Sequence, residues 1–156
     1  MGLEAKNPYE NDEFKSSEAA EVDTELTEID HVAIAVYDLD EAIAEHRESF
    51  GVLVDHREVL EDEGVEVALL KVAQSYIQLM APTRDDSKLA AFLESRGAGL
   101  HHVGYRVDDC GAALAAMIAA GHEVVDTEPR AGVRGTTVAF IHPHTMFGTL
   151  VQLVEE

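Results

Sequence analysis

The sequence repeats one pattern twice, and the two copies lie about seventy residues apart. In each copy a histidine lies near the start and a glutamine lies in an apolar run near the end: His31 and Gln78 in the first copy, His102 and Gln152 in the second. The paired residues are 47 positions apart in the first copy and 50 in the second. A chain of 156 residues suits one globular domain, so the repeat predicts two half-domains within it.

The local pattern of the first copy predicts a strand, a helix and three further strands. Its opening run alternates between small and branched side chains, which places His31 on the same strand face as Ala33. Asp38, with Glu41 three residues later, predicts a helix N-cap and capping box, and Gly51 predicts the helix end. Short β-rich runs follow at 52–58, 65–71 and 75–80.

The second copy repeats this order of elements. The predicted fold class is therefore α+β, with two tandem βαβββ modules at about 29–81 and 100–156 in a single domain, 29–156. The second module has an alanine-rich helix at 112–120, and its further strands are predicted at Val124–Val125, Thr136–Ile141 and Thr149–Val154. The linker 82–98 is predicted to contain a short helix capped by Ser87 or Asp86.

Acidic residues dominate the charge of the chain. The formal net charge is -20, from 31 acids and 11 bases, which argues against nucleic acid as a partner. Residues 1–28 carry nine acids and two lysines, and we expect them to form a mostly disordered acidic tail. An acid-rich surface with few lysines is typical of proteins that work in concentrated salt. An ordinary acidic cytosolic protein is the alternative.

The single cysteine limits both the compartment and the metal chemistry. Cys110 has no partner for an intramolecular disulfide, which favours a reducing, cytoplasmic setting. It also excludes a thiolate cluster, so a metal would need imidazole, amide or carboxylate ligands. The sequence has no apolar run long enough to span a membrane and no signal-peptide pattern at its start, so we expect no membrane partner.

The repeated polar residues point to a shared metal site. A lone histidine in an apolar strand is most simply a buried, hydrogen-bonded core residue. Recurrence at matching positions is different, because core packing needs no particular polar residue and an unpartnered buried amide is costly. If the modules pair face to face, His31, Gln78, His102 and Gln152 supply two imidazoles and two amide oxygens. This set suits one divalent ion such as Co²⁺, Mn²⁺, Ni²⁺, Zn²⁺ or Fe²⁺, with open positions for water or substrate.

These modules resemble the vicinal oxygen chelate superfamily, and in detail the methylmalonyl-CoA epimerase family. The resemblance runs from about Ile29 to the C-terminus. It rests on Asp30-His31-Val32-Ala33, Ile77-Gln78-Leu79-Met80-Ala81-Pro82, Gly99-Leu100-His101-His102-Val103, Glu128-Pro129-Arg130, and Phe140-Ile141-His142-Pro143 leading to Gly148-Thr149-Leu150-Val151. It implies a curved mixed sheet around a metal cleft, and a homodimer.

The resemblance also implies the ligand set and one departure from it. The family's metal ligands match His31, Gln78, His102 and the position of Gln152, where the family normally has a glutamate. An amide at Gln152 neutralises no metal charge and cannot act as a base, so we expect weaker metal binding and a more Lewis-acidic bound ion. His101 is not carried over, because in a regular strand its side chain points away from that of His102.

The base and the substrate contacts are also inferred from the resemblance. Some family members use a glutamate base on the third strand; ungapped matching from Gly64 places Val67 there, with Glu66 next to it. Glu66 is therefore the candidate base only if a β-bulge shifts the register, and otherwise it is a solvated strand residue. The cations proposed for coenzyme A are Arg130, Arg134 and Lys71, the first two of which flank a glycine-containing loop that could equally be a flexible hairpin with solvated arginines.

Two histidines before the last strand complete the candidates. His142 and His144 flank Pro143, where the family has a turn close to the substrate, and an imidazole there could contact substrate or transfer protons. Turn structure explains them equally well. The function that the resemblance implies is metal-dependent epimerisation of a 2-methylmalonyl-CoA-type thioester through an enolate. The alternatives are a glyoxalase-like lyase and a non-catalytic protein that binds a small molecule in the cleft.

Overall fold

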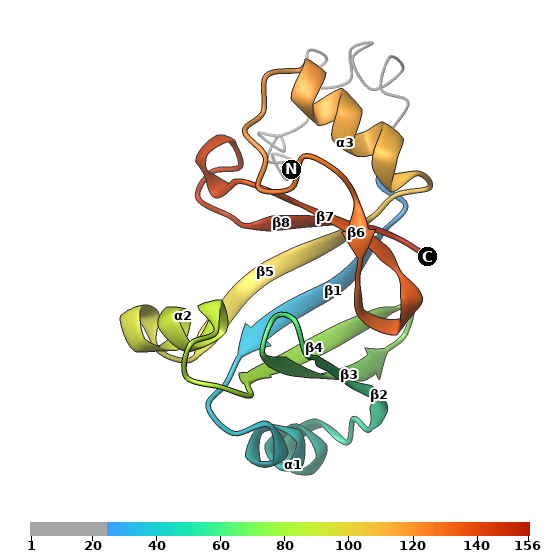
Figure 1. The fold of residues 1–156 in the computed structure, drawn as a ribbon. Coiled ribbons are helices and arrows are strands. Elements are labelled where there is room, and N and C mark those ends of the chain that lie inside the picture. The colour runs from blue at the N-terminus through green and yellow to red at the C-terminus, as the bar shows by residue number, and fades with distance from the viewer. Residues whose placement is uncertain (1–24) are drawn as a thin grey trace, which may run out of the picture.

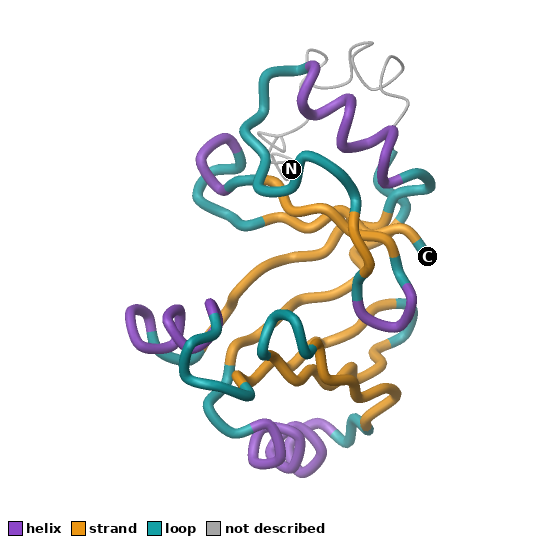
Figure 2. The backbone as a smooth tube through the Cα atoms, viewed as in Figure 1, coloured by secondary structure: helices purple, strands orange, loops and turns teal. Residues whose placement is uncertain are grey.

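In the computed structural model, residues 25–156 form one curled, mixed sheet with helices on its outer side (Figures 1 and 2). The tail was predicted at residues 1–28, and its first 24 residues lie outside the part of the chain that the structure describes. The strands are β1 (Glu28–Ala35), β2 (Val54–Leu60), β3 (Val65–Val72), β4 (Ser75–Pro82), β5 (Gly99–Arg106), β6 (Arg130–Ala131), β7 (Thr137–Ile141) and β8 (Val151–Glu155). The α-helices are α1 (Leu39–Phe50), α2 (Lys88–Arg96) and α3 (Cys110–Ala119), and short 3-10 turns cover Val133–Gly135 and Pro143–Thr145.

The strand order confirms the two-module prediction. Within residues 25–156 it is β2-β3-β4-β1-β5-β8-β7-β6, so each module arranges its four strands in the same way. The opening strand of each module pairs in parallel with its closing strand, β1 with β4 and β5 with β8. The modules join where β1 and β5 pair antiparallel, at the centre of the sheet. The fold is α+β, with two βαβββ units related by a local twofold arrangement.

Helices α1 and α3 cover the outer side of the curled sheet. The side chain of Asp38 accepts a hydrogen bond from the Glu41 amide at 3.0 Å and caps α1, as predicted, and Gly51 ends that helix with φ 69°. Asp109 caps α3 in the same way, and Ser87 caps the linker helix α2. In Figure 1, α1 lies below the first module and α3 above the second, and α2 lies at one end of the sheet, where its Leu89 and Leu93 pack with Val67 and Met80.

One predicted strand of the second module is wrong. Val124 makes only an isolated bridge to Ile141, and the second strand of the module is instead the two-residue β6, which pairs with β7. The reason is local: the amides of Val125 and Asp126 both donate to the carbonyl of Phe140, at 3.0 and 3.2 Å, so the ladder stops there. The strands predicted at 136–141 and 149–154 correspond to β7 and β8.

The core is divided between the modules. Leu39 of α1 packs against Ala68, Leu70 and Leu79 on the outer side of β3 and β4. Leu114 of α3 packs in the equivalent place, on a cluster that includes Ile141 of β7. Each module therefore buries its own helix against its own strands, while Leu89 and Leu93 of α2 form a third cluster on the inner face, beside the polar residues. None of the helices between residues 25 and 156 is long and apolar enough to cross a membrane.

Candidate metal centre

The four predicted ligands come from four different strands and share the inner face of the sheet. Their positions follow from the strand register. Each glutamine pairs with a small residue on the neighbouring strand, and on its other side that small residue pairs with the histidine of the other module. The two rows are Gln78–Ala33–His102 and His31–Gly104–Gln152. Because side chains two apart on a strand share a face, both rows point the same way. The small residues leave space above the sheet that the four longer side chains surround.

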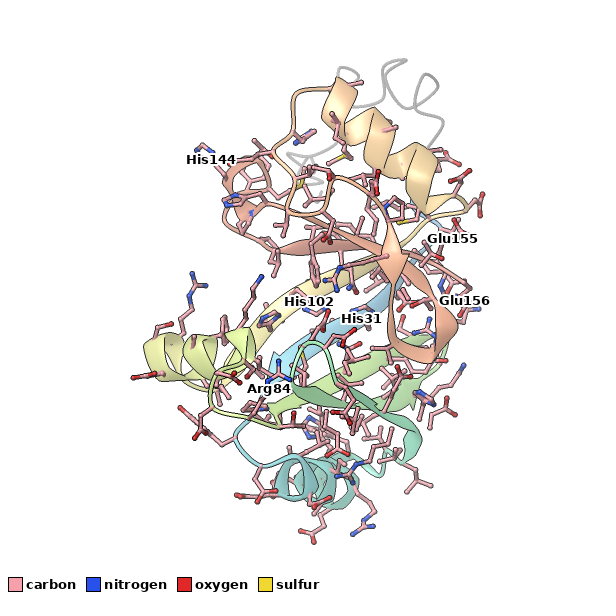
Figure 3. All side chains as sticks on the ribbon, in the orientation of Figure 1. His31, Arg84, His102, His144, Glu155 and Glu156 are labelled. Atoms are coloured by element: carbon pink, nitrogen blue, oxygen red, sulfur yellow. The ribbon has the colours of Figure 1, made fainter. Side chains whose placement is uncertain are left out.

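The two histidines point at each other across the junction of the modules (Figure 3). Their Nε2 atoms lie 2.9 Å apart, and both side chains are buried. Two nitrogens bound to one ion at 2.0–2.1 Å, with an angle near 90°, lie about 2.9 Å apart. The imidazoles are therefore spaced as two ligands of one metal would be. Gln78, which is also buried, and Gln152 line the same cavity as the two rings.

The electrostatics keep one of these rings neutral. Burial is the main cause that lowers the pKa of His102 well below its usual value, and the neighbouring His31 and His101 lower it further, against a hydrogen bond with Gln152. A neutral imidazole has a free lone pair, which is what metal ligation requires. Within residues 25–156, no three His, Cys, Asp or Glu side chains come together as ligands, so this site depends on its two amides.

His31 is held from behind by an acidic neighbour that sequence reasoning did not select. The Nδ1 atom of His31 lies 2.7 Å from Oδ2 of Asp30, which is fully buried. The other oxygen of Asp30 accepts hydrogen bonds from Arg106 and Arg134, each at 2.7 Å. Burial alone would raise the pKa of Asp30, but the hydrogen bonds from His31 and the two arginines outweigh it and hold that pKa well below its usual value. Asp30 is therefore ionised.

The expectation that His101 points away from its neighbour is wrong. Nδ1 of His101 lies 2.8 Å from Nδ1 of His102, so both rings lie on one side of β5. A shift of register in the β1–β5 ladder explains this, because Ala33 pairs with His102 while the next residue, Ile34, pairs with Leu100. The extra residue is a β-bulge, and a bulge turns two successive side chains to the same face.

Glu66 lies away from the cleft, which corrects its candidacy as the base. The β3–β4 ladder has an unbroken register from Val65 to Val72, so no bulge turns Glu66 inward. Its carboxylate instead accepts hydrogen bonds from Arg57, at 3.1 and 3.2 Å, and Arg57 also pairs with Asp40 of α1 on the outer side. Val67 occupies the inward position and lines the metal cavity. The place that the family resemblance assigned to a base therefore holds an aliphatic side chain.

Arg130 lies in the wall of the cleft, as predicted for a residue that contacts substrate. It forms an ion pair with Glu63, from the turn between β2 and β3, which spans the gap between the two modules. Both residues line the metal cavity and also a larger adjoining pocket. Glu63 was not predicted as a site residue. The acidic turn that contains it was visible in the sequence, but only the packing of the two modules brings that turn to the cleft.

The other residues that were predicted to contact substrate are either paired with other side chains or lie outside the cleft. Arg134 borders the metal cavity, but its guanidinium is paired with Asp30 and Glu156, so it supports the site from behind. Lys71 lies beside the ring of Tyr76 on the far part of β3 and does not line the cleft. His142 and His144 both lie near Glu123 on an exposed loop, and Figure 3 shows His144 away from His31 and His102. The structure therefore does not bring these two histidines to the metal cavity.

The larger pocket adjoins the metal cavity and provides a way in. Met80, Phe140, Glu63 and Arg130 border both spaces, so the two are continuous. Two further cations, Arg84 and Lys88, line the larger pocket near the start of α2. Four carboxylates line it as well, those of Asp62, Glu63, Asp86 and Asp126, and Arg84 is paired with Asp86, so the charge of the pocket is mixed. A ligand in this pocket can extend to the histidines of the metal cavity.

Comparison with known proteins gives consistent matches. Residues 30–140 match the model of the Glyoxalase/Bleomycin resistance protein/Dioxygenase superfamily. The ethylmalonyl-CoA/methylmalonyl-CoA epimerase of Cereibacter sphaeroides is 39% identical over 127 residues, which cover 80% of this chain and 95% of that protein.

Solved structures agree. A variant of Streptomyces coelicolor methylmalonyl-CoA epimerase in complex with 2-nitronate-propionyl-CoA has a TM-score of 0.81 and 38% identity, covering 85% of this chain and 96% of the other. A methylmalonyl-CoA epimerase in complex with methylmalonyl-CoA and NH4+ has the same score, identity and coverage.

Proposed function

The chain belongs to the Glyoxalase/Bleomycin resistance protein/Dioxygenase superfamily, and on that premise we propose that it is a metal-dependent epimerase of 2-methylmalonyl-CoA-type thioesters. The observation that carries the proposal is the 2.9 Å approach of the His31 and His102 Nε2 atoms between two glutamines, in a cleft that adjoins a larger pocket. The named relatives and the substrate complex of a similar structure favour this activity over that of a glyoxalase-like lyase.

In this proposal His31, Gln78, His102 and Gln152 hold one divalent ion. A bound divalent cation supplies a Lewis acid for the thioester carbonyl and the carboxylate of the substrate. All four protein ligands are neutral, so they remove none of the charge of the ion. Both histidines are buried, and fixed polar groups in a buried site stabilise a developing enolate charge more strongly than they would in water.

Proton transfer needs a base that can reach the α-carbon. Asp30 and Glu63 are the carboxylates that line the cavity among the described residues, and Asp30 is already committed to His31 and two arginines. We assign one proton transfer to Glu63, which takes the α-proton of the thioester while the electron pair of the C–H bond moves into the enolate. In the same proposal the neighbouring Arg130, which now pairs with Glu63, pairs with the substrate carboxylate and so releases Glu63.

Three finer proposals rest on composition and on the family. The charge of -20 supports work in concentrated salt, and the lone cysteine supports a cytoplasmic location. A homodimer is implied by the family resemblance and is tested by light scattering on the purified protein. Unfolding measured across a series of KCl concentrations tests the salt proposal, since a halophilic protein gains stability with salt where an ordinary acidic protein changes little.

The experiment that tests the function measures metal content and exchange together. Purified protein is loaded with Co²⁺, and the incorporation of solvent deuterium at the α-carbon of methylmalonyl-CoA is followed with and without the metal. We expect exchange that depends on the metal, that is lost in His102→Ala and that is kept in His144→Ala, whose side chain lies outside the cleft. Metal and acyl-CoA binding without any exchange would instead support a non-catalytic binding protein.

A further inference from the structure

Each candidate ligand histidine follows a residue that a β-bulge has turned to the same side. In β1 the extra residue is Asp30, because Ile29 pairs with Tyr105 whereas His31 pairs with Gly104. In β5 the extra residue is His101, which precedes His102. The two bulges therefore lie at equivalent positions of the two modules, immediately before the histidine. In a regular strand the residue before a histidine points to the opposite face and cannot touch its ring.

The bulges give both rings the same kind of support. Oδ2 of Asp30 lies 2.7 Å from Nδ1 of His31, and Nδ1 of His101 lies 2.8 Å from Nδ1 of His102. An ionised carboxylate can only accept, so Nδ1 of His31 carries the proton and Nε2 keeps its lone pair. If His102 likewise donates from Nδ1, its Nε2 lone pair faces that of His31 across 2.9 Å. Two lone pairs aimed at each other repel, unless a cation lies between them.

The two supporting residues, Asp30 and His101, are held in place by different kinds of contact. Asp30 is fully buried and held by Arg106 and Arg134, which also contact Glu156 near the end of the chain. Glu28 accepts a further hydrogen bond from Arg106, so three carboxylates surround two arginines and the group keeps one excess negative charge. His101 is held by Phe92 of α2, whose ring centroid lies 4.7 Å away. One support is an anion in an ionic network, and the other is a ring packed against an aromatic side chain.

We propose that Asp30 and His101 are the positioning residues of the metal centre, which hold both ligand histidines as Nδ1–H tautomers with their Nε2 atoms converging. The inference rests on the metal-dependent function proposed above. It adds that Asp30 supplies, from behind His31, the negative charge that the four neutral ligands lack. Groups that support a metal-ligating histidine in this way typically change metal affinity by about 10–100-fold when they are removed.

The test measures Co²⁺ affinity in variants that separate support of the ring from support of the fold. Asp30→Asn removes the charge, and we expect a loss of about 10–100-fold in Co²⁺ affinity. His101→Phe keeps the packing on Phe92 but removes the acceptor, and we expect a loss toward the lower end of that range. Arg57→Gln is the matched control, because it breaks the ion pairs with Glu66 and Asp40 on the outer side of the sheet without touching Asp30 or His31. It should lower the unfolding temperature but leave Co²⁺ affinity close to that of the wild type.

A second readout reports the tautomer directly. In ¹⁵N-resolved NMR spectra of the metal-free protein, we expect the Nδ1–H signal of His31 to be present in the wild type and in Arg57→Gln, and to be lost or shifted in Asp30→Asn. If Asp30→Asn fails to fold because two arginines are left unpaired, His101→Phe still tests the inference at a partly exposed position.

The outcomes distinguish this inference from the function on which it rests. A wild-type protein that binds no Co²⁺ would overturn the proposed metal centre and the positioning roles with it. A wild-type protein that binds Co²⁺, with equal affinity in His101→Phe and Asp30→Asn, would overturn the positioning roles alone. An equal loss of affinity in Arg57→Gln and Asp30→Asn would also overturn them, because it would show that general stability controls binding.

Discussion

The imidazole of His31 lies directly over the backbone of Gly104, at a point where a β-carbon would come within 2.3 Å of its Cε1 atom. Gly104 is the residue that faces His31 across the β1–β5 ladder, and it is also the neighbour of Gln152. Only a residue without a side chain leaves room for the ring in this position, from which its Nε2 atom reaches His102. The proposed metal centre therefore depends on a missing side chain as much as on the four that surround it.

Gly104→Ala should disturb the ring of His31 and weaken metal binding. The added methyl group cannot fit while the ring keeps its place, so we expect a loss of stability of about 1–3 kcal/mol together with reduced Co²⁺ affinity. Gly111→Ala is the control, since its β-carbon would meet only ordinary contacts at 3.5 Å or more near the start of α3. Thermal unfolding and Co²⁺ titration measure both effects. Unchanged Co²⁺ affinity in Gly104→Ala would show that the ring position is not constrained in this way.

Gln152→Glu should tighten metal binding. The substitution places one negative charge in a set of ligands that has none, and the affinity of oxygen-containing sites rises with the charge of their ligands. We expect Co²⁺ affinity to increase by about tenfold or more. Gln74→Glu, in the turn between β3 and β4, makes the same change of charge away from the cavity and should have little effect. Equal affinities in wild type and Gln152→Glu would indicate that this side chain does not reach the ion.

Glu63→Gln should slow epimerisation with little change in metal content. If Glu63 carries one proton transfer, its amide cannot, and the rate should fall by about 10²–10⁴-fold. Glu66→Gln is the decisive comparison, because that carboxylate faces Arg57 on the outer side of the sheet and its loss should leave the rate unchanged. The rate is followed from the conversion of one methylmalonyl-CoA epimer to the other. If epimerisation were slow in Glu66→Gln and unchanged in Glu63→Gln, the proton transfer would belong to Glu66 and not to Glu63.

Cys110 should make the protein lose stability in alkaline solution. Burial, and then the nearby Glu155, Asp109 and Asp126, raise the pKa of this thiol from 9.0 to about 11. Between these values the folded protein keeps the proton while the unfolded chain has lost it, so the free energy of unfolding falls as the pH rises. The fall attributable to this group is at most about 3 kcal/mol between pH 9 and 11.

The Cys110→Ala variant isolates this contribution from that of other titrating groups. It lowers stability at every pH by removing buried volume, but its stability should decline less steeply above pH 9. Denaturant unfolding at intervals between pH 8 and 11 compares the two proteins. Parallel pH profiles would show that the thiol does not contribute.

The fold was largely readable from local signals. The alternation around His31, the caps at Asp38 and Ser87 and the glycine at position 51 each depend on neighbours within a few residues, and the structure confirms all of them. The prediction at Val124–Val125 was wrong because the amides of Val125 and Asp126 both donate hydrogen bonds to the carbonyl of a distant residue, Phe140, which ends the strand there. β-rich composition alone could not reveal that competition.

The site was readable in part. Repetition identified the two histidines and two glutamines, because packing of a core does not explain why the same polar residue recurs at matching positions of both copies. It could not identify Asp30 as a support or place His101 beside His102, since both depend on bulges in the pairing of β1 with β5. Nor could it reject Glu66 as a base, because the direction of that side chain follows from a ladder with no bulge.

The sequence by itself determined that two similar modules exist and that each brings one histidine and one glutamine to a strand. Those conclusions need only the period of the side chains and the repetition of the pattern. The tertiary structure decided how the modules meet, and this junction determines which side chains lie together at the centre of the sheet. Pairing β1 with β5 brings His31 against Gly104, and the two bulges in that pairing turn Asp30 and His101 inward. Register between distant strands is a long-range property, so only the folded chain could settle it.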